Sequence, residues 1–80
     1  MCQLTSLAMV MNAMGIKRKR SDCQFEDELY DVANLAGYGG SKLWEQTIKV
    51  YSAIIPKYNE NLEIDNFYSN VISLKFELST

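Results

Sequence analysis

Apolar residues recur at helical spacing in four segments of this chain, and turn-forming residues separate those segments. The predicted helices run from about Gln3 to Met14, from Ser21-Asp22 to Gly37, from Ser41 to Pro56, and from Asp65 to Leu78. The chain has 80 residues, of which 48% are apolar, and this is enough for one small folded core. The sequence therefore predicts a mainly α fold of about four helices in a single domain over residues 1–80.

The first segment is apolar nearly all round. One face carries Leu4, Leu7, Ala8, Met11 and Met14, and the other carries Met9, Val10 and Ala13. A helix of this kind is predicted to lie in the middle of a core. Gly15 is predicted to end it, because glycine adopts the left-handed conformation that closes many helices.

The other helix boundaries follow from capping and breaking residues. Ser21 or Asp22 is predicted to cap the second helix, and Gly37 to close it. Ser41 is predicted to cap the third helix and Pro56 to stop it. The apolar members of the third helix are Leu43, Trp44, Ile48, Tyr51 and Ile55. Asp65 is predicted to cap the last helix, whose apolar stripe is Phe67, Val71, Leu74 and Leu78.

Charge and hydropathy exclude several classes of partner. The net charge is −2, and we interpret the one basic run, Lys17–Arg20, as a solvated connector, so no nucleic-acid partner is predicted. The longest apolar stretch, from Leu4 to Ile16, is too short to span a membrane. Basic residues follow this stretch instead of preceding it, so it is not typical of a signal peptide. Localisation stays open.

The titratable residues predict no metal or cofactor. Two cysteines are too few for a four-thiolate zinc site, and a Cys2–Cys23 disulfide stays open as an alternative. The acidic residues of the second helix and its approach are Asp22, Glu26, Asp27, Glu28 and Asp31. We interpret them as solvated residues near a helix N-terminus, where negative charge is favourable.

Cys2 is the strongest candidate for a chemically reactive residue. A thiol in the first turn of a helix experiences the positive end of the helix dipole, which favours the nucleophilic thiolate. The same unpaired N–H groups can receive the negative charge that develops on a carbonyl oxygen during acyl transfer. The alternative interpretation is that Cys2 is a small buried apolar residue.

The residues after Cys2 carry a family resemblance. The run Cys2-Gln-Leu-Thr-Ser-Leu-Ala-Met, with Gly15 after the helix, resembles the nucleophile helix of papain-like cysteine peptidases. It is most similar to the bacteriocin-processing group, which cuts after a double glycine. The resemblance implies that the chain is the N-terminal helical half of such an α+β peptidase, with the β-sheet half absent. It also implies that Cys2 is the catalytic nucleophile and that the substrate is a peptide or a related amide.

The sequence departs from the family at the other catalytic residues. It contains no histidine to act as the general base, and no glutamine precedes Cys2. We therefore predict that the chain is inactive on its own and requires a His-bearing half. An exposed apolar surface is expected to support binding of that half, a homo-oligomer or a segment swap.

Two alternatives stay open. The first is a small, non-catalytic helical protein that binds or inhibits a partner, which the missing histidine favours. The second applies if Met1 is removed, because Cys2 would then carry a free α-amine that can act as a nearby base.

Overall fold

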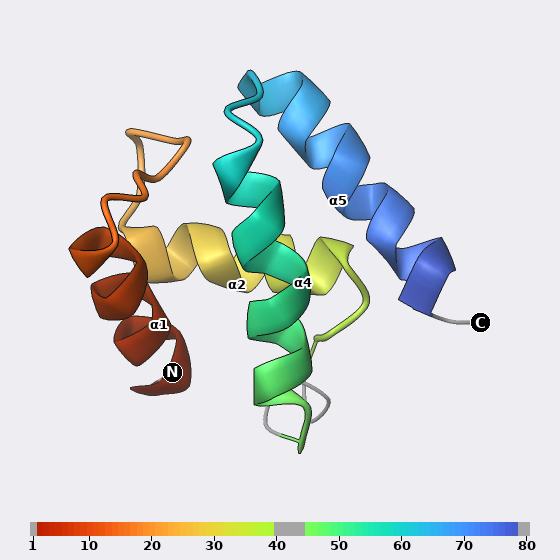
Figure 1. Cartoon of the computed structure of the whole chain (residues 1–80), viewed down its shortest axis with the longest axis horizontal. Helices are drawn as coiled ribbons and strands as arrows, with labels where there is room; N and C mark the ends of the chain where they lie inside the picture. The colour runs from red at the N-terminus through yellow and green to blue at the C-terminus, as the bar shows by residue number, and fades with distance from the viewer. Residues whose placement is uncertain (1, 40–44, 79–80) are drawn as a thin grey trace.

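The chain folds into helices, as the computed structural model in Figure 1 shows. The structure describes residues 2–39 and 45–78. Its helices are α1 (Cys2–Ala13), α2 (Phe25–Leu35), α4 (Thr47–Asn59) and α5 (Ile64–Leu78), and these described ranges contain no strand. The predicted mainly α class is confirmed. Within the same ranges, no helix combines the length and the apolar character needed to cross a membrane.

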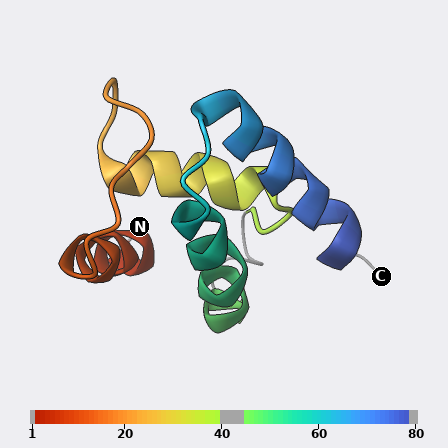
Figure 2. The same cartoon turned by 45° about the horizontal axis from the view of Figure 1, so that its top comes forward.

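Helix α2 is the central element. It contacts α1, α4 and α5, while α1 and α5 lie on opposite sides of α4 (Figures 1 and 2). Leu29 and Val32 of α2 are fully buried. The full set of buried apolar residues is Leu4, Leu7, Ala8, Met11, Ile16, Leu29, Val32, Ala33, Ala36, Tyr38, Val50, Ile54, Tyr58, Phe67, Val71 and Leu74. All four helices therefore contribute to one core.

The prediction that the first helix lies in the middle of the core is wrong. Helix α1 buries only one face, and on the other face Met9 and Val10 are 69% and 52% exposed. Met14, predicted on the buried face, follows the end of the helix and is 57% exposed. Apolar residues all round a helix permit central burial, but they do not bring other helices to cover every side. The outer face of α1 is thus an apolar surface on the outside of the molecule.

Glycines end α1 and α2, as predicted. Gly15 has a φ of 82°, and beyond it the Ile16 N–H donates to the Met11 carbonyl at 2.9 Å. Gly37, with a φ of 92°, ends α2 through the same type of turn. A side chain at either position would strain the left-handed conformation, which is why glycine predicts these ends well.

The predicted start of the second helix is wrong. Helix α2 begins at Phe25, and its N-cap residue Gln24 makes no side-chain capping bond. The side chain of Asp22 accepts hydrogen bonds from the Arg20 guanidinium instead. The loop before α2 is therefore held by other contacts, described below.

Pro56 does not stop α4, so this prediction is also wrong. The helix continues through Pro56 to Asn59. A proline inside a helix removes one backbone hydrogen bond and crowds the preceding turn. The extra turn offsets this loss because it buries Tyr58, which is 5% exposed and bonds to Glu28.

The buried face of α4 is also displaced from the predicted one. Val50 and Ile54 are fully buried, whereas Ile48 is 80% exposed. Tyr51 and Ile55 are half-buried. Two apolar stripes one residue apart run along this helix, the predicted one and the one that contains Val50 and Ile54. Packing against α2 and α5 buries the stripe of Val50 and Ile54. The predicted members Leu43 and Trp44 and the predicted cap Ser41 lie outside the described residues.

The predicted stripe of the last helix is confirmed in α5. Phe67 and Val71 are fully buried and Leu74 is 7% exposed. The side chain of Leu78 lies outside the described part of the structure. Helix α5 begins at Ile64, so Asp65 lies in its first turn instead of preceding it.

Candidate functional site

Cys2 is the first residue of α1, which is 12 residues long and has no acidic residue in its first turn. The first N–H groups of an α-helix have no partner within the helix. The positive end of the α1 dipole is therefore not offset by a carboxyl group of that turn. The side chain of Cys2 lies outside the described part of the structure.

The first turns of α1 are anchored to α4 and to the core. The Tyr51 hydroxyl donates a hydrogen bond to the Gln3 carbonyl at 3.1 Å. Leu4 and Leu7 are each 1% exposed. These contacts fix the direction of the helix that begins at Cys2, as a positioned nucleophile requires.

A groove of about 590 Å³ lies beside α1, between this helix, the loop at 16–21 and the start of α2. Thr5 lines its near end, one helical turn after Cys2. Ala8 and Met9 continue the α1 wall, and Ile16 and Phe25 complete the apolar part of the lining. Nothing in the sequence pattern predicts this groove, because its walls come from three separate elements.

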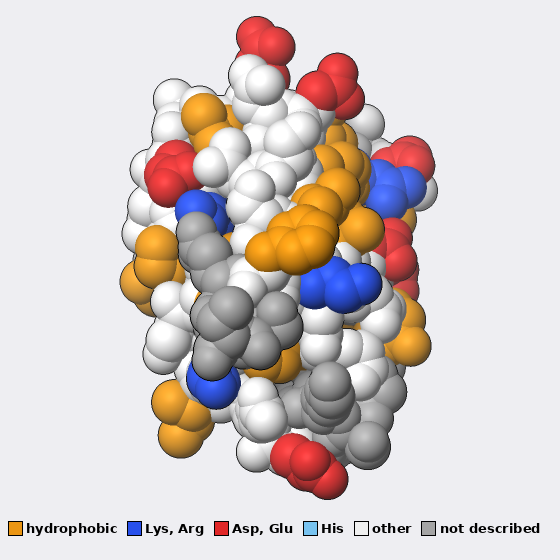
Figure 3. Space-filling view, turned by 90° about the vertical axis from the view of Figure 1, so that its right-hand side faces the viewer, with side chains coloured by type: hydrophobic (Ala, Val, Ile, Leu, Met, Phe, Trp, Pro, Cys, Tyr) orange, Lys and Arg blue, Asp and Glu red, His pale blue; other side chains and the backbone are white. Residues whose placement is uncertain are grey.

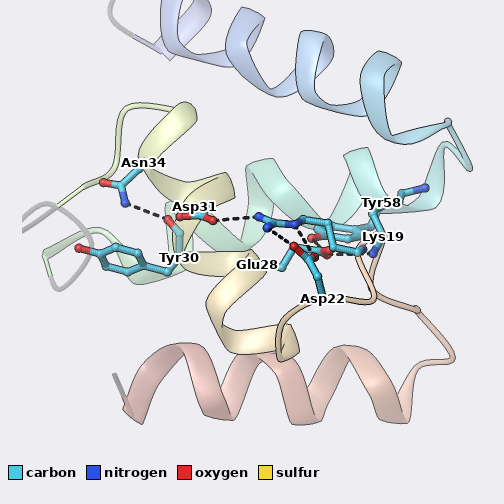
Figure 4. Close-up of polar contacts among 8 residues, drawn as sticks. Lys19, Asp22, Glu28, Tyr30, Asp31, Asn34 and Tyr58 are labelled. Carbon is cyan, nitrogen blue, oxygen red and sulfur yellow. Dashed lines mark hydrogen bonds and ion pairs between the residues drawn. The ribbon is translucent and has the colours of Figure 1, made fainter.

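Glu28 holds the loop that forms one wall of the groove (Figure 4). Its Oε1 accepts the backbone N–H groups of Lys19 and Arg20 at 2.9 and 2.6 Å. Its Oε2 accepts the Lys19 N–H at 3.0 Å and the Tyr58 hydroxyl at 2.5 Å. Glu28 is fully buried, so its carboxyl group joins the loop, α2 and α4 inside the protein.

The interpretation of Glu28 as a solvated residue is wrong. A buried carboxyl group requires hydrogen-bond donors, and here two loop amides and a tyrosine supply them. Burial, reinforced by the hydrogen bond to Glu28, raises the pKa of Tyr58 above its usual range. One feature of the sequence does indicate that Glu28 is buried, because Glu28 falls on the same helical face as Phe25, Leu29 and Val32.

The outer side of the same loop carries ion pairs. The Arg20 guanidinium lies 2.8 Å from the Asp22 carboxyl group and 3.2 Å from that of Asp31. The hydrogen bond from Arg20 lowers the pKa of Asp22. In residues 2–39 and 45–78, no three His, Cys, Asp or Glu side chains come together as a metal site.

Cys23 is a free, half-buried thiol, so the structure does not contain the Cys2–Cys23 disulfide left open by the sequence. Burial raises the pKa of the Cys23 thiol, while the nearby Arg20 charge opposes this shift. A raised pKa disfavours the thiolate. Cys23 is therefore expected to carry less thiolate at neutral pH than a free cysteine, which makes it a useful internal reference for Cys2.

Comparison of the chain with protein-family models, curated proteins and solved structures returns no match.

Proposed function

We propose that this chain is the helical, nucleophile-bearing part of a papain-like cysteine peptidase or amide hydrolase, with Cys2 as its nucleophile. The observation that carries the proposal is the position of Cys2 at the start of α1, followed by the Leu-Thr-Ser-Leu-Ala-Met sequence. The anchoring of α1 by Tyr51 and Leu4 supports it, because a nucleophile on a fixed helix end is already oriented.

In this proposal, the start of α1 supplies both the nucleophile and the groups that stabilise the oxyanion. The Cys2 thiolate would add to the carbonyl carbon of an amide, and the unpaired N–H groups of the first turn would receive the developing negative charge. Collapse of this intermediate releases an amine, which needs a proton as it leaves. The chain has no histidine to supply that proton, so the proposal places the general acid and base on a His-bearing half outside this sequence.

Exposed apolar residues support association with such a half. They include Met9 and Val10 on α1, Met14 just after it, and Ile72 and Phe76 on α5, and single residues on α2 and α4, Tyr30 and Ile48, are exposed as well. Figure 3 views the α5 side, where apolar side chains lie among charged ones. Such patches are typical of surfaces that bind another protein or segment.

The pH dependence of alkylation at Cys2 tests the proposal. In a Cys23→Ser variant, iodoacetamide reports Cys2 alone, and we expect a midpoint below about pH 7.5, as at other helix N-termini. The matched Cys2→Ser variant reports Cys23, whose midpoint should lie above that of a free thiol because burial raises its pKa. A Cys2 midpoint at the free-thiol value of about 8.5 contradicts the proposal.

A non-catalytic binding protein is the second candidate, and the groove beside α1 together with the missing histidine favours it. The Cys2→Ser variant separates the two. A binding protein keeps its partner affinity without the thiol, whereas a peptidase completed by its His-bearing half loses all turnover.

A further inference from the structure

The groove beside α1 combines an apolar lining with a basic edge. Ala8, Met9, Ile16 and Phe25 form the apolar lining, and the basic run at 17–20 borders it. Met9 is 69% exposed, so a ligand in the groove can cover a large flexible apolar side chain. Glu26 is the one carboxyl group among the described lining residues. The edge is thus basic on a chain whose net charge is −2.

Two cations of the basic run are already engaged within the protein. The Lys19 ammonium donates to the Leu62 carbonyl at 2.7 Å and lies 5.4 Å from the centre of the Phe67 ring. The Arg20 guanidinium forms the ion pairs with Asp22 and Asp31. These two side chains hold the loop in place and are not the charges that a ligand would use.

Lys17 and Arg18 are the cations that the groove presents outward. Both are exposed, and both line the groove. One Arg18 Nη1 N–H donates to the Cys23 carbonyl at 3.1 Å, which fixes the guanidinium across the loop and leaves other N–H donors for an acceptor. A guanidinium held in this way favours a carboxylate, which it can bind through two parallel hydrogen bonds.

We infer that this groove binds an acidic peptide segment of a partner protein. An apolar side chain of the segment lies against Met9 and Phe25, and its carboxylates face Lys17 and Arg18. The apolar lining favours a peptide over a nucleic acid, whose backbone offers charge without apolar side chains. This binding needs no thiol and is therefore independent of the proposed chemistry of Cys2.

Fluorescence anisotropy with short labelled peptides tests the inference on the whole chain. The probes are a peptide of alternating Glu and Leu and a counterpart of alternating Lys and Leu. We expect the acidic peptide to bind at least about tenfold more tightly, with an affinity that falls as salt rises. Equal binding of the two peptides would overturn the inference.

Matched variants locate the binding. Lys17→Glu and Arg18→Glu should each weaken binding of the acidic peptide about tenfold, while Lys49→Glu on the exposed surface of α4 should not change it. Met9→Ser should weaken binding, and Ile48→Ser, which alters an even more exposed apolar residue of α4, should not. Thermal unfolding of each variant checks that the fold is kept, and the milder Lys17→Gln replaces any variant that unfolds. If the changes in the groove and the control changes on α4 weaken peptide binding equally, the peptide binds elsewhere and the inference is overturned.

Two further measurements distinguish other occupants. A labelled oligothymidylate that binds as tightly as the acidic peptide, without loss in Met9→Ser, would indicate a polyanion site instead. Sedimentation equilibrium in which Met9→Ser or Arg18→Glu abolishes self-association would indicate a second copy of the chain. Either result contradicts the acidic-peptide assignment, whereas unchanged peptide binding by Cys2→Ser confirms its independence from the thiol.

Discussion

Arg20 takes part in two polar clusters, one through its backbone and one through its side chain. Its backbone N–H points inward to Glu28 at 2.6 Å, in a cluster that also includes Tyr58. Its guanidinium points outward to Asp22 and Asp31. The inner carboxyl group is fully buried, while the side chains of the two outer acids are 66% and 56% exposed.

We expect burial, more than distance, to decide how much each of these polar contacts contributes to stability. The outer ion pairs, at 2.8 and 3.2 Å, are close to the inner hydrogen bonds in length, but water and salt compete with them. The inner Glu28 carboxyl group and Tyr58 hydroxyl are buried, so they cannot exchange a lost partner for bulk water. The loop that lines the groove should therefore depend on Glu28 and very little on Asp31.

The largest effect is expected from Glu28→Ala. This change leaves two partly buried loop amides and the buried Tyr58 hydroxyl without their acceptor, and we expect a loss of about 3–5 kcal/mol in the free energy of unfolding. Urea denaturation followed by circular dichroism measures it. Glu28→Gln, which keeps the volume and one acceptor oxygen, is the control and should lose less. A loss below about 1 kcal/mol for alanine would show that the inner cluster is not stabilising.

Tyr58→Phe should have an intermediate effect. The ring still packs against Phe67, but one acceptor site of the buried Glu28 loses its donor, so we expect a loss of about 1–3 kcal/mol. The same denaturation experiment measures this change. Tyr51→Phe, which removes a hydroxyl from a half-buried ring of the same helix, is the matched control. The comparison fails if the Tyr51 variant loses as much stability as the Tyr58 variant.

Alkaline pH should weaken the inner cluster by a smaller amount. The pKa of Tyr58 is raised in the folded state, so only the unfolded chain releases this proton near pH 10. The contribution of Tyr58 to stability is thus constant below about pH 10 and falls above it, by about 1 kcal/mol at pH 11. Denaturation at pH 9 and 11 measures the fall. It should be smaller in Tyr58→Phe, where Tyr38 and Tyr68, whose pKa values are also raised, still contribute. Identical pH dependence in both proteins would contradict this assignment.

Asp31→Asn should have the smallest effect. The Asp31 side chain is 56% exposed, and Arg20 keeps its shorter contact with Asp22. We expect an unfolding transition that cannot be distinguished from that of the original chain, at low or high salt. A loss comparable to that of Tyr58→Phe would mean that the outer ion pairs, and not burial, hold the loop.

The local chemistry of single residues made much of the fold predictable. Gly15 and Gly37 end their helices because the left-handed conformation there suits glycine whatever surrounds it. The Phe67, Val71 and Leu74 stripe in α5 is confirmed because its i, i+4, i+7 spacing puts the three side chains on one face of the helix. At the candidate site, the position of Cys2 at the start of a helix follows from the same local pattern.

Other features depend on contacts between distant segments, and sequence patterns did not predict them. Pro56 is tolerated inside α4 because the turn after it brings Tyr58 to Glu28, 30 residues away in the chain. The groove needs α1, the loop and α2 to be in place together.

The sequence by itself determined where α1 and α2 end and which residue is the candidate nucleophile, since backbone conformation and thiol chemistry belong to single residues. Only the tertiary structure decided that α2 is central, that one face of α1 is exposed and that Glu28 is buried. Whether a side chain is buried depends on which elements pack over it, and a polar side chain stays buried only where those elements bring it partners.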